Sequence, residues 1–484
     1  MHSHFLRAVS IRGRLFNVLR EKRVKGRPRR SDSDEEASGP PAIAKCQQRK
    51  STGKFNVVII FERSDEYMER KAILVGVNVN NNQEDFVYSM QELGNLAAAG
   101  NVIVLGDMTQ NLNQINKSHY IGTGKIQELH NFLKEKDADM VICDEELSPS
   151  QIRNLESELE CEVIDRTMLI LDIFASRAKT RESQLQVEVA RLKYMLPRLI
   201  GMRESLGRQG GGAGLKNRGA GETKLELDRR KVEEKIAKLT KELEKLVAQR
   251  KTQRKKRTQN EIPVVSLVGY TNAGKSTIMN AMLEKFSRGA DKQVFEKNML
   301  FATLETSVRK IKLKNNKAFL LTDTVGFINK LPHHLVKAFR STLEEVIEAD
   351  LLIHVIDYSN PYHEEQKKLT KHVLADIGVK DIPIIYAYNK ADLMEGSFPS
   401  IHHDRVYLSA KNRVGLDELS QFISNQIFDD YIHCEFLIPY SEGEIVSYFN
   451  EQSHIRATEY ESSGTLLKVE CRKADAEKYN QYIR

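Results

Sequence analysis

The chain has 484 residues, of which 40% are hydrophobic, so it is long enough to form two or three domains that each bury a core. Lysine and arginine number 74 against 67 aspartates and glutamates, and the net charge of +7 mildly favours a polyanionic partner such as RNA without establishing one. The five cysteines form no CxxC pair, and no apolar run reaches the roughly 18 residues needed to cross a bilayer, which argues against a disulfide framework, a zinc ribbon and a membrane partner.

The chain begins with a basic segment. Its first thirty residues contain ten lysines and arginines and a single acid, Glu21, and residues 31–41 are rich in serine, acids, glycine and proline. Such a composition buries too little apolar area to offset chain entropy, so residues 1–50 are predicted to be a disordered basic extension. The same leader is compatible with an organellar transit peptide, and the sequence leaves both interpretations open.

A first α/β domain is predicted over residues 51–178. Short apolar, β-branched runs alternate there with segments of helical periodicity. We expect strands at residues 57–61, 72–77, 102–105, 140–143 and 162–164, and helices at residues 89–99, 125–134 and 148–159. Because strands that alternate with helices usually pair in parallel, this domain should contain a parallel sheet.

Two long helices are predicted next, over residues 180–199 and 223–257, as an antiparallel hairpin within residues 179–258. In the second helix, apolar residues recur every seven positions, as in a coiled-coil seam. The seam consists of Leu225, Val232, Leu239 and Leu246, with Ile236 and Leu243 between them. The first helix offers apolar residues for packing on this seam, namely Leu185, Val189, Leu192 and Met195.

A glycine-rich loop is expected between the two helices. It carries Gly207, Gly210, Gly211, Gly212, Gly214, Gly219 and Gly221, together with the basic residues Arg208, Lys216 and Arg218. A flexible, cationic loop on a stiff hairpin suits entry into a narrow, phosphate-lined RNA cleft, so the three basic residues are candidate RNA contacts. A disordered linker is the alternative interpretation.

A second α/β domain is predicted over residues 259–430. It opens with an apolar strand at residues 262–269 and continues with alternating strand and helix signals. The remaining residues, 431–484, contain scattered apolar and aromatic side chains and are expected to form a small α+β domain.

The second α/β domain contains a phosphate-binding motif of the form GxxxxGK[ST]. The motif follows an apolar strand and precedes a predicted helix, where consecutive backbone N–H groups can surround phosphates. Its lysine is expected to neutralise the β and γ oxygens, and its serine to offer a hydroxyl to Mg²⁺. The predicted contacts are Gly269, Tyr270, Thr271, Asn272, Ala273, Gly274, Lys275, Ser276 and Thr277.

Two later segments have the features of nucleotide-sensing switches. Asp323 ends a buried-type strand and would hold Mg²⁺ through water, while Gly326 is placed to bond the γ-phosphate through its N–H. Thr303 is the candidate residue that closes over Mg²⁺ when the γ-phosphate is present. Lys275, Thr303 and Gly326 are therefore the candidate catalytic residues, and further nucleotide contacts are expected at Phe301, Ala302, Leu304, Glu305, Thr324 and Val325.

Two short motifs predict guanine as the base. The carboxylate of Asp392 can accept both the N1 hydrogen and the exocyclic amine hydrogen of guanine, a donor pair that adenine lacks. Ala410 would present its N–H to the guanine oxygen. Each motif follows a strand, and together they comprise Asn389, Lys390, Ala391, Asp392, Ser409, Ala410 and Lys411.

One expected catalytic side chain is absent. Phe327 follows Gly326, at a position where many small GTPases carry a glutamine that orients the attacking water. The missing group must come from elsewhere in the chain, from a partner or from a bound cation. Asn272 is a candidate ligand for K⁺ beside the phosphates, and the alternative is that it only shapes the loop.

Beyond these motifs, the sequence resembles the HflX family of ribosome-associated GTPases from about residue 69 to near its C-terminus. The resemblance includes segments outside the nucleotide motifs, namely residues 120–125 (YIGTGK), 144–149 (DEELSP), 165–167 (DRT), 186–190 (QVEVA), 219–226 (GAGETKLE) and 331–336 (LPHHLV). It implies an N-terminal α/β domain special to the family, the helical hairpin with its glycine-rich loop, a Ras-like P-loop GTPase domain and a small C-terminal α+β domain.

The resemblance also implies a function. A family member is expected to hydrolyse GTP to GDP and phosphate, to bind the large ribosomal subunit and its ribosomal RNA, and to split or rescue stalled ribosomes under stress. It would act as a monomer in the cytoplasm, with an organellar matrix left open by the basic leader. The alternative is a GTP-gated ribosome assembly factor or an RNA-remodelling binding protein, and ATP binding by the N-terminal domain is a further implication of the family.

Overall fold

The computed structural model describes residues 70–79, 83–208, 218–258, 262–286, 300–301, 306–313, 317–332, 335, 340–396, 398–429 and 431–484. Outside them lie the predicted extension at residues 1–50, the expected strand at 57–61, and the site candidates Lys216, Ala302, Thr303, Leu304 and Glu305. Among the described helices, none combines the length and the apolar character that a membrane span requires.

The first α/β part is built on a four-stranded parallel sheet with the strand order β2-β1-β3-β4. Its elements are β1 (Arg70–Asn78), α1 (Gln83–Ala99), β2 (Val102–Asn111), α2 (Thr123–Lys136), β3 (Met140–Cys143), α3 (Pro149–Leu159), β4 (Glu162–Asp165) and α4 (Arg166–Arg177). The chain order reverses between β1 and β3, so the carboxyl ends of these two strands flank the sheet's topological switch point, where open α/β sheets usually place functional groups.

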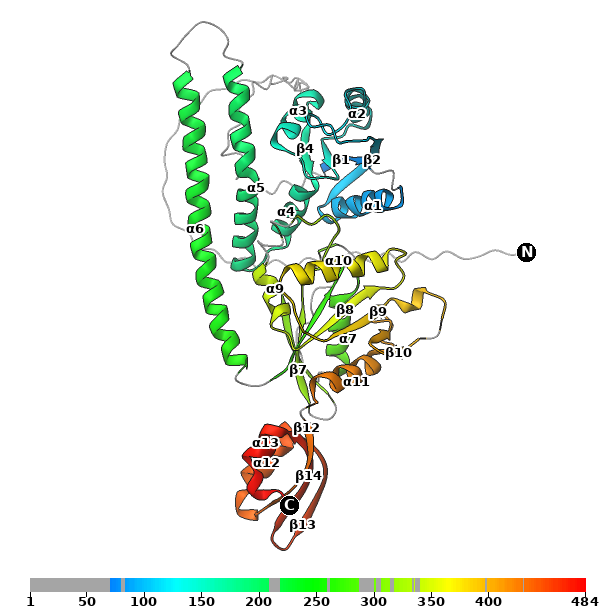
Figure 1. Ribbon diagram of the computed structural model, residues 1–484, viewed down its shortest axis with the longest axis vertical. Coiled ribbons are helices and arrows are strands. Elements are labelled where there is room, and N and C mark those ends of the chain that lie inside the picture. The colour runs from blue at the N-terminus through cyan, green and yellow to red at the C-terminus, as the bar shows by residue number, and fades with distance from the viewer. Residues whose placement is uncertain are drawn as a thin grey trace, which may run out of the picture. The chain divides into compact units, whose positions relative to one another are not determined.

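Alternation along the strands explains the two helical layers around this sheet (Figure 1). Ala72 and Leu74 of β1 face one apolar cluster, which α1 and α4 complete, whereas Ile73 and Val75 face a second cluster with α2 and α3. Successive side chains of a strand point to opposite faces, so a strand covered on both sides is apolar throughout.

Helix α4 is absent from the sequence-based prediction. Its sequence, RTMLILDIFASR, is apolar on nearly all sides, so the polar face that reveals a surface helix is missing. The helix start is nevertheless well defined, because the Asp165 side chain accepts a hydrogen bond from the Met168 N–H at 2.9 Å. A capping box between Ser148 and Gln151 starts α3 in the same way, one residue after the predicted helix start.

Helices α5 (Arg181–Arg208) and α6 (Arg218–Thr258) lie side by side and form the hairpin (Figure 1). Ion pairs join the start of α5 to the end of α6, as Glu182 does with Arg250, while Glu188 pairs with Lys235 at 2.6 Å farther along. The two helices are therefore antiparallel, as predicted. Of the expected seam, Val232 is buried together with Leu185, Val189 and Leu192, and Leu239 and Leu246 are half-buried.

The loop between these helices is shorter than predicted. Gly207 belongs to α5, and Gly219 and Gly221 belong to α6, although all three were expected in the loop. A glycine inside a helix costs about 1 kcal/mol relative to alanine, so composition alone favours a loop, but good helix formers adjoin these positions. Arg208 and Arg218 are accordingly the last residue of α5 and the first of α6, and only their backbone is described.

The second α/β part has a seven-stranded sheet with the order β10-β11-β9-β8-β5-β7-β6, antiparallel at its two edges and parallel between them. Its elements are β5 (Val264–Gly269), α7 (Lys275–Phe286), β6 (Ser307–Lys312), β7 (Ala318–Asp323), α9 (Arg340–Ile347), β8 (Leu351–Asp357), α10 (His363–Asp376), β9 (Ile384–Asn389), η2 (Ala391–Leu393), β10 (Ser400–His402), β11 (Arg405–Tyr407) and α11 (Leu416–Ile427). One face packs on α7 and α11, and the other on α9 and α10.

A small antiparallel sheet, β12-β14-β13, ends the chain (Figure 1). Its elements are β12 (Tyr431–Ile438), η3 (Tyr440–Glu442), α12 (Gly443–Gln452), β13 (His454–Glu461), β14 (Gly464–Arg472), α13 (Lys473–Lys478) and η4 (Asn480–Tyr482). Its core is a stacked pair of rings, Phe436 and Phe449, with Leu467 and Val469 beside them. This agrees with the α+β character expected of this segment.

Candidate functional site

The phosphate-binding motif lies between β5 and α7, at the carboxyl end of a central parallel strand. Gly269 has a φ of 144°, and a Cβ there would lie 2.2 Å from the carbonyl oxygen of Val355. Gly274 has a φ of 97°, and a Cβ there would lie 2.2 Å from the side-chain nitrogen of Asn389. Because the loop runs so close to Val355 and Asn389, only glycine fits at these two positions.

Lys275 is buried at the first turn of α7, and its ammonium group points into the loop. The Nζ donates hydrogen bonds to the carbonyl oxygens of Gly269 at 3.1 Å and Tyr270 at 2.8 Å. Burial lowers the pKa of Lys275 to about 8, although the Asp323 carboxylate acts in the opposite direction. The loop thus encloses a cation that is bonded to backbone carbonyl oxygens and would be stabilised by phosphate oxygens.

Ser276 and Asp323 meet from different elements, the former on α7 and the latter at the end of β7. The Ser276 hydroxyl donates a hydrogen bond to Asp323 Oδ2 at 2.6 Å. A hydroxyl and a carboxylate oxygen are the hard ligands that Mg²⁺ prefers. Their proximity fits the predicted magnesium site, to which Thr303 was also assigned.

The segment after Asp323 lies against the phosphate loop. A Cβ on Gly326 would be 2.8 Å from Lys275 Nζ and 2.7 Å from the Cα of Thr271, so this position also requires glycine. The next residue pairs with the loop, because Thr271 N–H donates to the Phe327 oxygen at 2.8 Å and Phe327 N–H donates to the Gly269 oxygen at 3.1 Å. The Phe327 side chain is 1% exposed within an apolar cluster and cannot orient a water molecule.

The base-recognition motifs are joined to the phosphate loop by one buried side chain. The Asn389 amide donates to the Ala273 carbonyl at 2.9 Å and accepts from the Ala410 N–H at 3.0 Å. Lys390 forms an ion pair with Asp357 at 2.7 Å, and Asp392 lies half-buried in the short helix η2 that follows. Asn389 therefore holds three segments that are far apart in sequence at one edge of the sheet.

The structure brings together most of the predicted nucleotide contacts. Phe301 differs from the others in that its ring packs edge-on against Phe174 of α4, with ring centroids 4.7 Å apart. Thr324 is fully buried, and its hydroxyl donates to the Leu267 carbonyl at 2.7 Å, which indicates a role in holding β7 against β5. The nucleotide roles of all these residues remain predictions.

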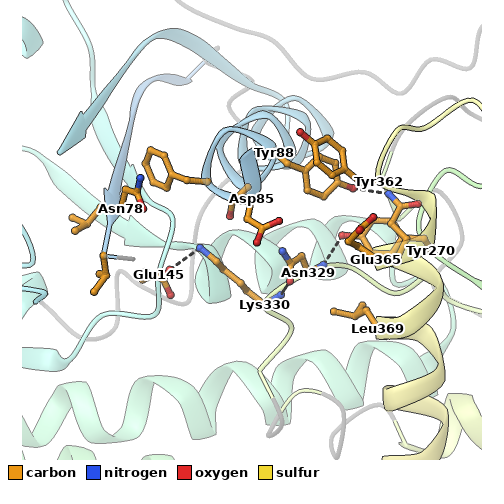
Figure 2. A pocket seen from close by; sticks show the side chains of 15 residues that line it. Asn78, Asp85, Tyr88, Glu145, Tyr270, Asn329, Lys330, Tyr362, Glu365 and Leu369 are labelled. Carbon is orange, nitrogen blue, oxygen red and sulfur yellow. Dashed lines mark hydrogen bonds and ion pairs between the residues drawn. The ribbon is translucent and has the colours of Figure 1, made fainter. Parts of the chain in front are cut away.

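A buried charge cluster adjoins the phosphate loop and was not predicted from the sequence. It joins Glu92, Asp144 and Arg166 of the first α/β part to Tyr270 and Lys330 of the second. Asp144 and Arg166 occur in segments that resemble the family, which was the available signal, but isolated charged residues in a sequence do not reveal that they meet. Figure 2 shows Lys330 reaching Glu145 across this region.

A cavity of about 460 Å³ lies beside the cluster (Figure 2). Its lining includes Asn78 at the end of β1, Tyr88 of α1, Glu145, Tyr270 and Lys330. Among the nucleotide-motif residues that the structure describes, Tyr270 alone belongs to this lining, so the cavity adjoins the phosphate loop rather than forming part of it.

The charges of the cluster depend on one another. Although burial acts to raise the pKa of Asp144, the nearby Arg166 and Lys330 hold it below its usual value. Burial acts to lower the pKa of Arg166, but Asp144 and Glu92 outweigh it and raise the pKa. The guanidinium therefore stays charged because its acidic partners are buried with it.

Comparisons with known proteins match consecutive parts of the chain between residues 87 and 390. Three family models apply, described as GTP-binding GTPase N-terminal over residues 87–175, GTP-binding GTPase Middle Region over residues 177–257, and 50S ribosome-binding GTPase over residues 264–390. The three matched regions thus overlap the predicted α/β part, hairpin and P-loop part in turn.

Several similar proteins carry the name GTPase HflX. The chain is 46% identical over 402 residues to GTPase HflX of Caldanaerobacter subterraneus, covering 83% of this chain and 91% of that protein. It is 38% identical over 413 residues to GTPase HflX of Escherichia coli, covering 84% and 94%. A crystal structure of a GTP-binding protein from Sulfolobus solfataricus in complex with GDP is 26% identical, with a TM-score of 0.41, covering 74% of this chain and 99% of that one.

Proposed function

Because this chain belongs to the HflX family of GTPases, we propose that it binds the large ribosomal subunit and couples GTP binding and hydrolysis to the splitting or rescue of stalled ribosomes. It is a GTPase, and the reaction converts GTP to GDP and phosphate. The match of residues 264–390 to a model described as 50S ribosome-binding GTPase supports the large subunit as the partner. The place of action would be the compartment that contains those ribosomes, the cytoplasm or an organellar matrix.

The observation that best supports a guanine-nucleotide switch is the pair of hydrogen bonds made by Asn389. These bonds hold the phosphate loop, the segment containing Asp392 and the turn at Ala410 next to one another. A guanine nucleotide needs this arrangement, because its phosphates and its base lie at opposite ends of one molecule. In this proposal Lys275 neutralises the β and γ oxygens, and Asp392 accepts two hydrogen bonds from guanine.

Ser276 and Asp323 would hold Mg²⁺, which supplies positive charge to the phosphate oxygens when bound. Gly326 would donate its N–H to the γ-phosphate, and the same N–H finds no such acceptor on GDP. The segment containing Gly326 is therefore the proposed sensor of nucleotide state.

The buried position of Phe327 means that this residue does not supply the group that orients water. We propose that the ribosome supplies or positions it, so that hydrolysis is slow until the GTP form has bound. Asn272 is exposed on the phosphate loop and is the candidate ligand for a K⁺ ion that would add positive charge there. Arg208, Lys216 and Arg218 at the hairpin end are the proposed contacts with ribosomal RNA.

Sedimentation of ribosomes tests this function. GTP-loaded protein mixed with intact ribosomes is expected to increase the free-subunit peaks, and Lys275→Ala, which removes the phosphate-binding cation, is expected to leave the ribosome peak unchanged. Co-sedimentation of the wild-type protein with ribosomes that stay intact would instead favour the assembly-factor alternative. Absence of the protein from both the ribosome and the large-subunit fractions would contradict either role.

A further inference from the structure

The backbone of Asn329 is held at both of its polar groups by side chains from other segments. Its N–H donates to the hydroxyl of Tyr270 at 2.7 Å, and its carbonyl accepts from Arg166 at 3.1 Å. Lys330, the next residue, reaches Asp144 and Glu145, the latter at 2.6 Å. Asn329 and Lys330 are therefore bonded to the first α/β part, through Arg166, Asp144 and Glu145.

Tyr270 connects this arrangement to the phosphate loop, of which it is the second residue. Its hydroxyl accepts from Asn329 and donates to the buried carboxylate of Glu92. The same carboxylate accepts from Arg166 at 2.8 Å. A single phenol group thus joins the loop, the segment beyond Gly326 and helix α1 (Figure 2).

Arg166 is the fixed centre of the cluster. Its side chain is 2% exposed, and it donates to Glu92, to Asp144, to the oxygens of Ser89 and to the Asn329 carbonyl. A guanidinium has five N–H donors in a rigid plane, so these partners fix its orientation. Such a buried ion is strongly disfavoured when a partner is removed, which makes its arrangement hard to shift without a compensating interaction.

From these contacts we propose that Glu92, Asp144 and Arg166 set the position of Gly326 for GTP hydrolysis, acting through Tyr270, Asn329 and Lys330. Glu92, Asp144 and Arg166 are positioning residues rather than catalytic residues, because none of the three belongs to the predicted nucleotide contacts. The proposal depends on the closeness of Asn329 to Gly326 along the chain. Between them, the backbone of Phe327 is hydrogen-bonded to the phosphate loop. The proposal rests on the proposed role of Gly326 at the γ-phosphate.

A positioning role has a signature that simple stabilisation lacks. GDP has no γ-phosphate, so a displaced Gly326 weakens GTP binding and slows hydrolysis while it leaves GDP binding nearly unchanged. Loss of fold stability would weaken both nucleotides alike. The ratio of GTP to GDP affinity therefore distinguishes the two explanations.

The test uses two substitutions in the full-length protein. Tyr270→Phe removes only the hydroxyl, and Lys330→Met removes the ammonium while it keeps an apolar stem of similar length. We expect each to lower GTP affinity, measured with a non-hydrolysable GTP analogue, by about three- to tenfold, with less than about a twofold change for GDP. The intrinsic hydrolysis rate without ribosomes should fall in parallel.

Lys285→Met is the matched control. The Lys285 side chain is 28% exposed and pairs with Asp417 of the same α/β part at 2.6 Å. The Lys330 side chain is similarly exposed, at 30%, but its partners include the buried Asp144. Only Lys330 contacts the first α/β part. The Lys285 variant should therefore keep the wild-type ratio of GTP to GDP affinity.

Gly326→Ala separates failure of this inference from failure of the proposed site. If Gly326→Ala lowers the GTP to GDP ratio but Tyr270→Phe and Lys330→Met do not, the positioning role is wrong and the site assignment stands. The inference would also be overturned if Tyr270→Phe and Lys330→Met lowered the affinities for GTP and GDP equally, or if they raised the ratio of GTP to GDP affinity. An unchanged ratio in Gly326→Ala would refute the role of Gly326 itself and remove the basis of the positioning role.

Discussion

Lys275 illustrates how a residue predicted from a motif acquires a measurable property from its surroundings. The motif identifies the lysine, but only the folded structure shows that its ammonium is buried and bonded to two backbone carbonyl oxygens. Burial disfavours the charged form, and the pKa is lowered to about 8 in consequence. Phosphate oxygens would favour the charged form, so nucleotide binding and protonation of Lys275 should be linked.

The expected result is proton uptake when nucleotide binds near pH 8. The free protein carries the proton on Lys275 in about half of the molecules at that pH, and binding of phosphates raises the pKa, so about half a proton should be taken up per nucleotide. Uptake should decline towards pH 7, where the free lysine is already mostly charged, and grow towards pH 8.5. The phosphates themselves titrate near pH 6 and contribute little in this range.

Calorimetric titrations with GDP in two buffers of different ionisation enthalpy measure this uptake directly. An apparent binding enthalpy that is independent of the buffer at pH 8 would contradict the linkage. The comparison at pH 7 serves as an internal control, because the same buffers should then give nearly equal enthalpies.

At the scale of residues, the sequence permits predictions where the chemistry depends on neighbours in the sequence, and it gave none where the chemistry depends on neighbours in space. Gly269, Gly274 and Lys275 lie within one motif, and the structure gives each a local reason for its identity. Arg166 and Glu92 are separated by 74 positions, and nothing in either local sequence indicates that they form a buried ion pair. Long-range electrostatic partners of this kind are decided by the arrangement of elements.

At the scale of elements, the hairpin shows that periodicity predicts helices well but predicts their burial less well. The seven-residue repeat in α6 includes Val232, Leu239 and Leu246, yet only Val232 among these three is fully buried, and the other two are half-buried. A two-helix hairpin shields each seam from one side, so complete burial requires a further layer. Val232 should accordingly contribute more to the stability of the hairpin than the rest of the repeat.

Val232→Ala is expected to destabilise the hairpin by about 1–2 kcal/mol, because two buried methyl groups are lost and the better helix propensity of alanine offsets only part of that cost. Leu227→Ala on the same helix is the control, since Leu227 is 53% exposed and a surface substitution should change stability by less than about 0.5 kcal/mol. Hydrogen exchange of the α6 amides, measured for both variants, reports the difference. Equal exchange rates would show that Val232 does not anchor the hairpin.

Helix α4 shows why one element escaped prediction although it positions a central residue. Its apolar residues face the sheet, α1 and α5, so its sequence has no polar stripe with helical period. Asp165 accepts the Met168 N–H and thereby fixes the first turn, on which Arg166 is the first residue. The missed helix and the missed charge cluster meet at Arg166, and both were missed because most of their residues are buried between elements.

At the scale of the whole molecule, the lack of a water-orienting side chain after Gly326 predicts dependence on a partner. The buried ring of Phe327 cannot reach the site without leaving its apolar cluster, so the intrinsic rate should be low. Purified large ribosomal subunits are expected to raise the hydrolysis rate by at least about tenfold, since one positioned group that stabilises a transition state contributes on the order of 10²–10³.

Steady-state phosphate release, measured with and without large subunits, tests this expectation, and small subunits serve as the control particle. If large subunits left the hydrolysis rate unchanged, GTP hydrolysis would not be coupled to ribosome binding as proposed. In that case the catalytic group would have to be sought within the chain itself.

The sequence by itself determined the α/β class, the order of the nucleotide motifs, the antiparallel hairpin and membership of a GTPase family. These features depend on short-range patterns, namely strand and helix periodicity, glycine positions and motif spacing, all of which a linear sequence records. The tertiary structure alone decided that the first α/β part contacts the phosphate loop, through Arg166, Glu92 and Tyr270. A buried charge is tolerated only where several partners converge on it, and that convergence exists only once the chain has folded.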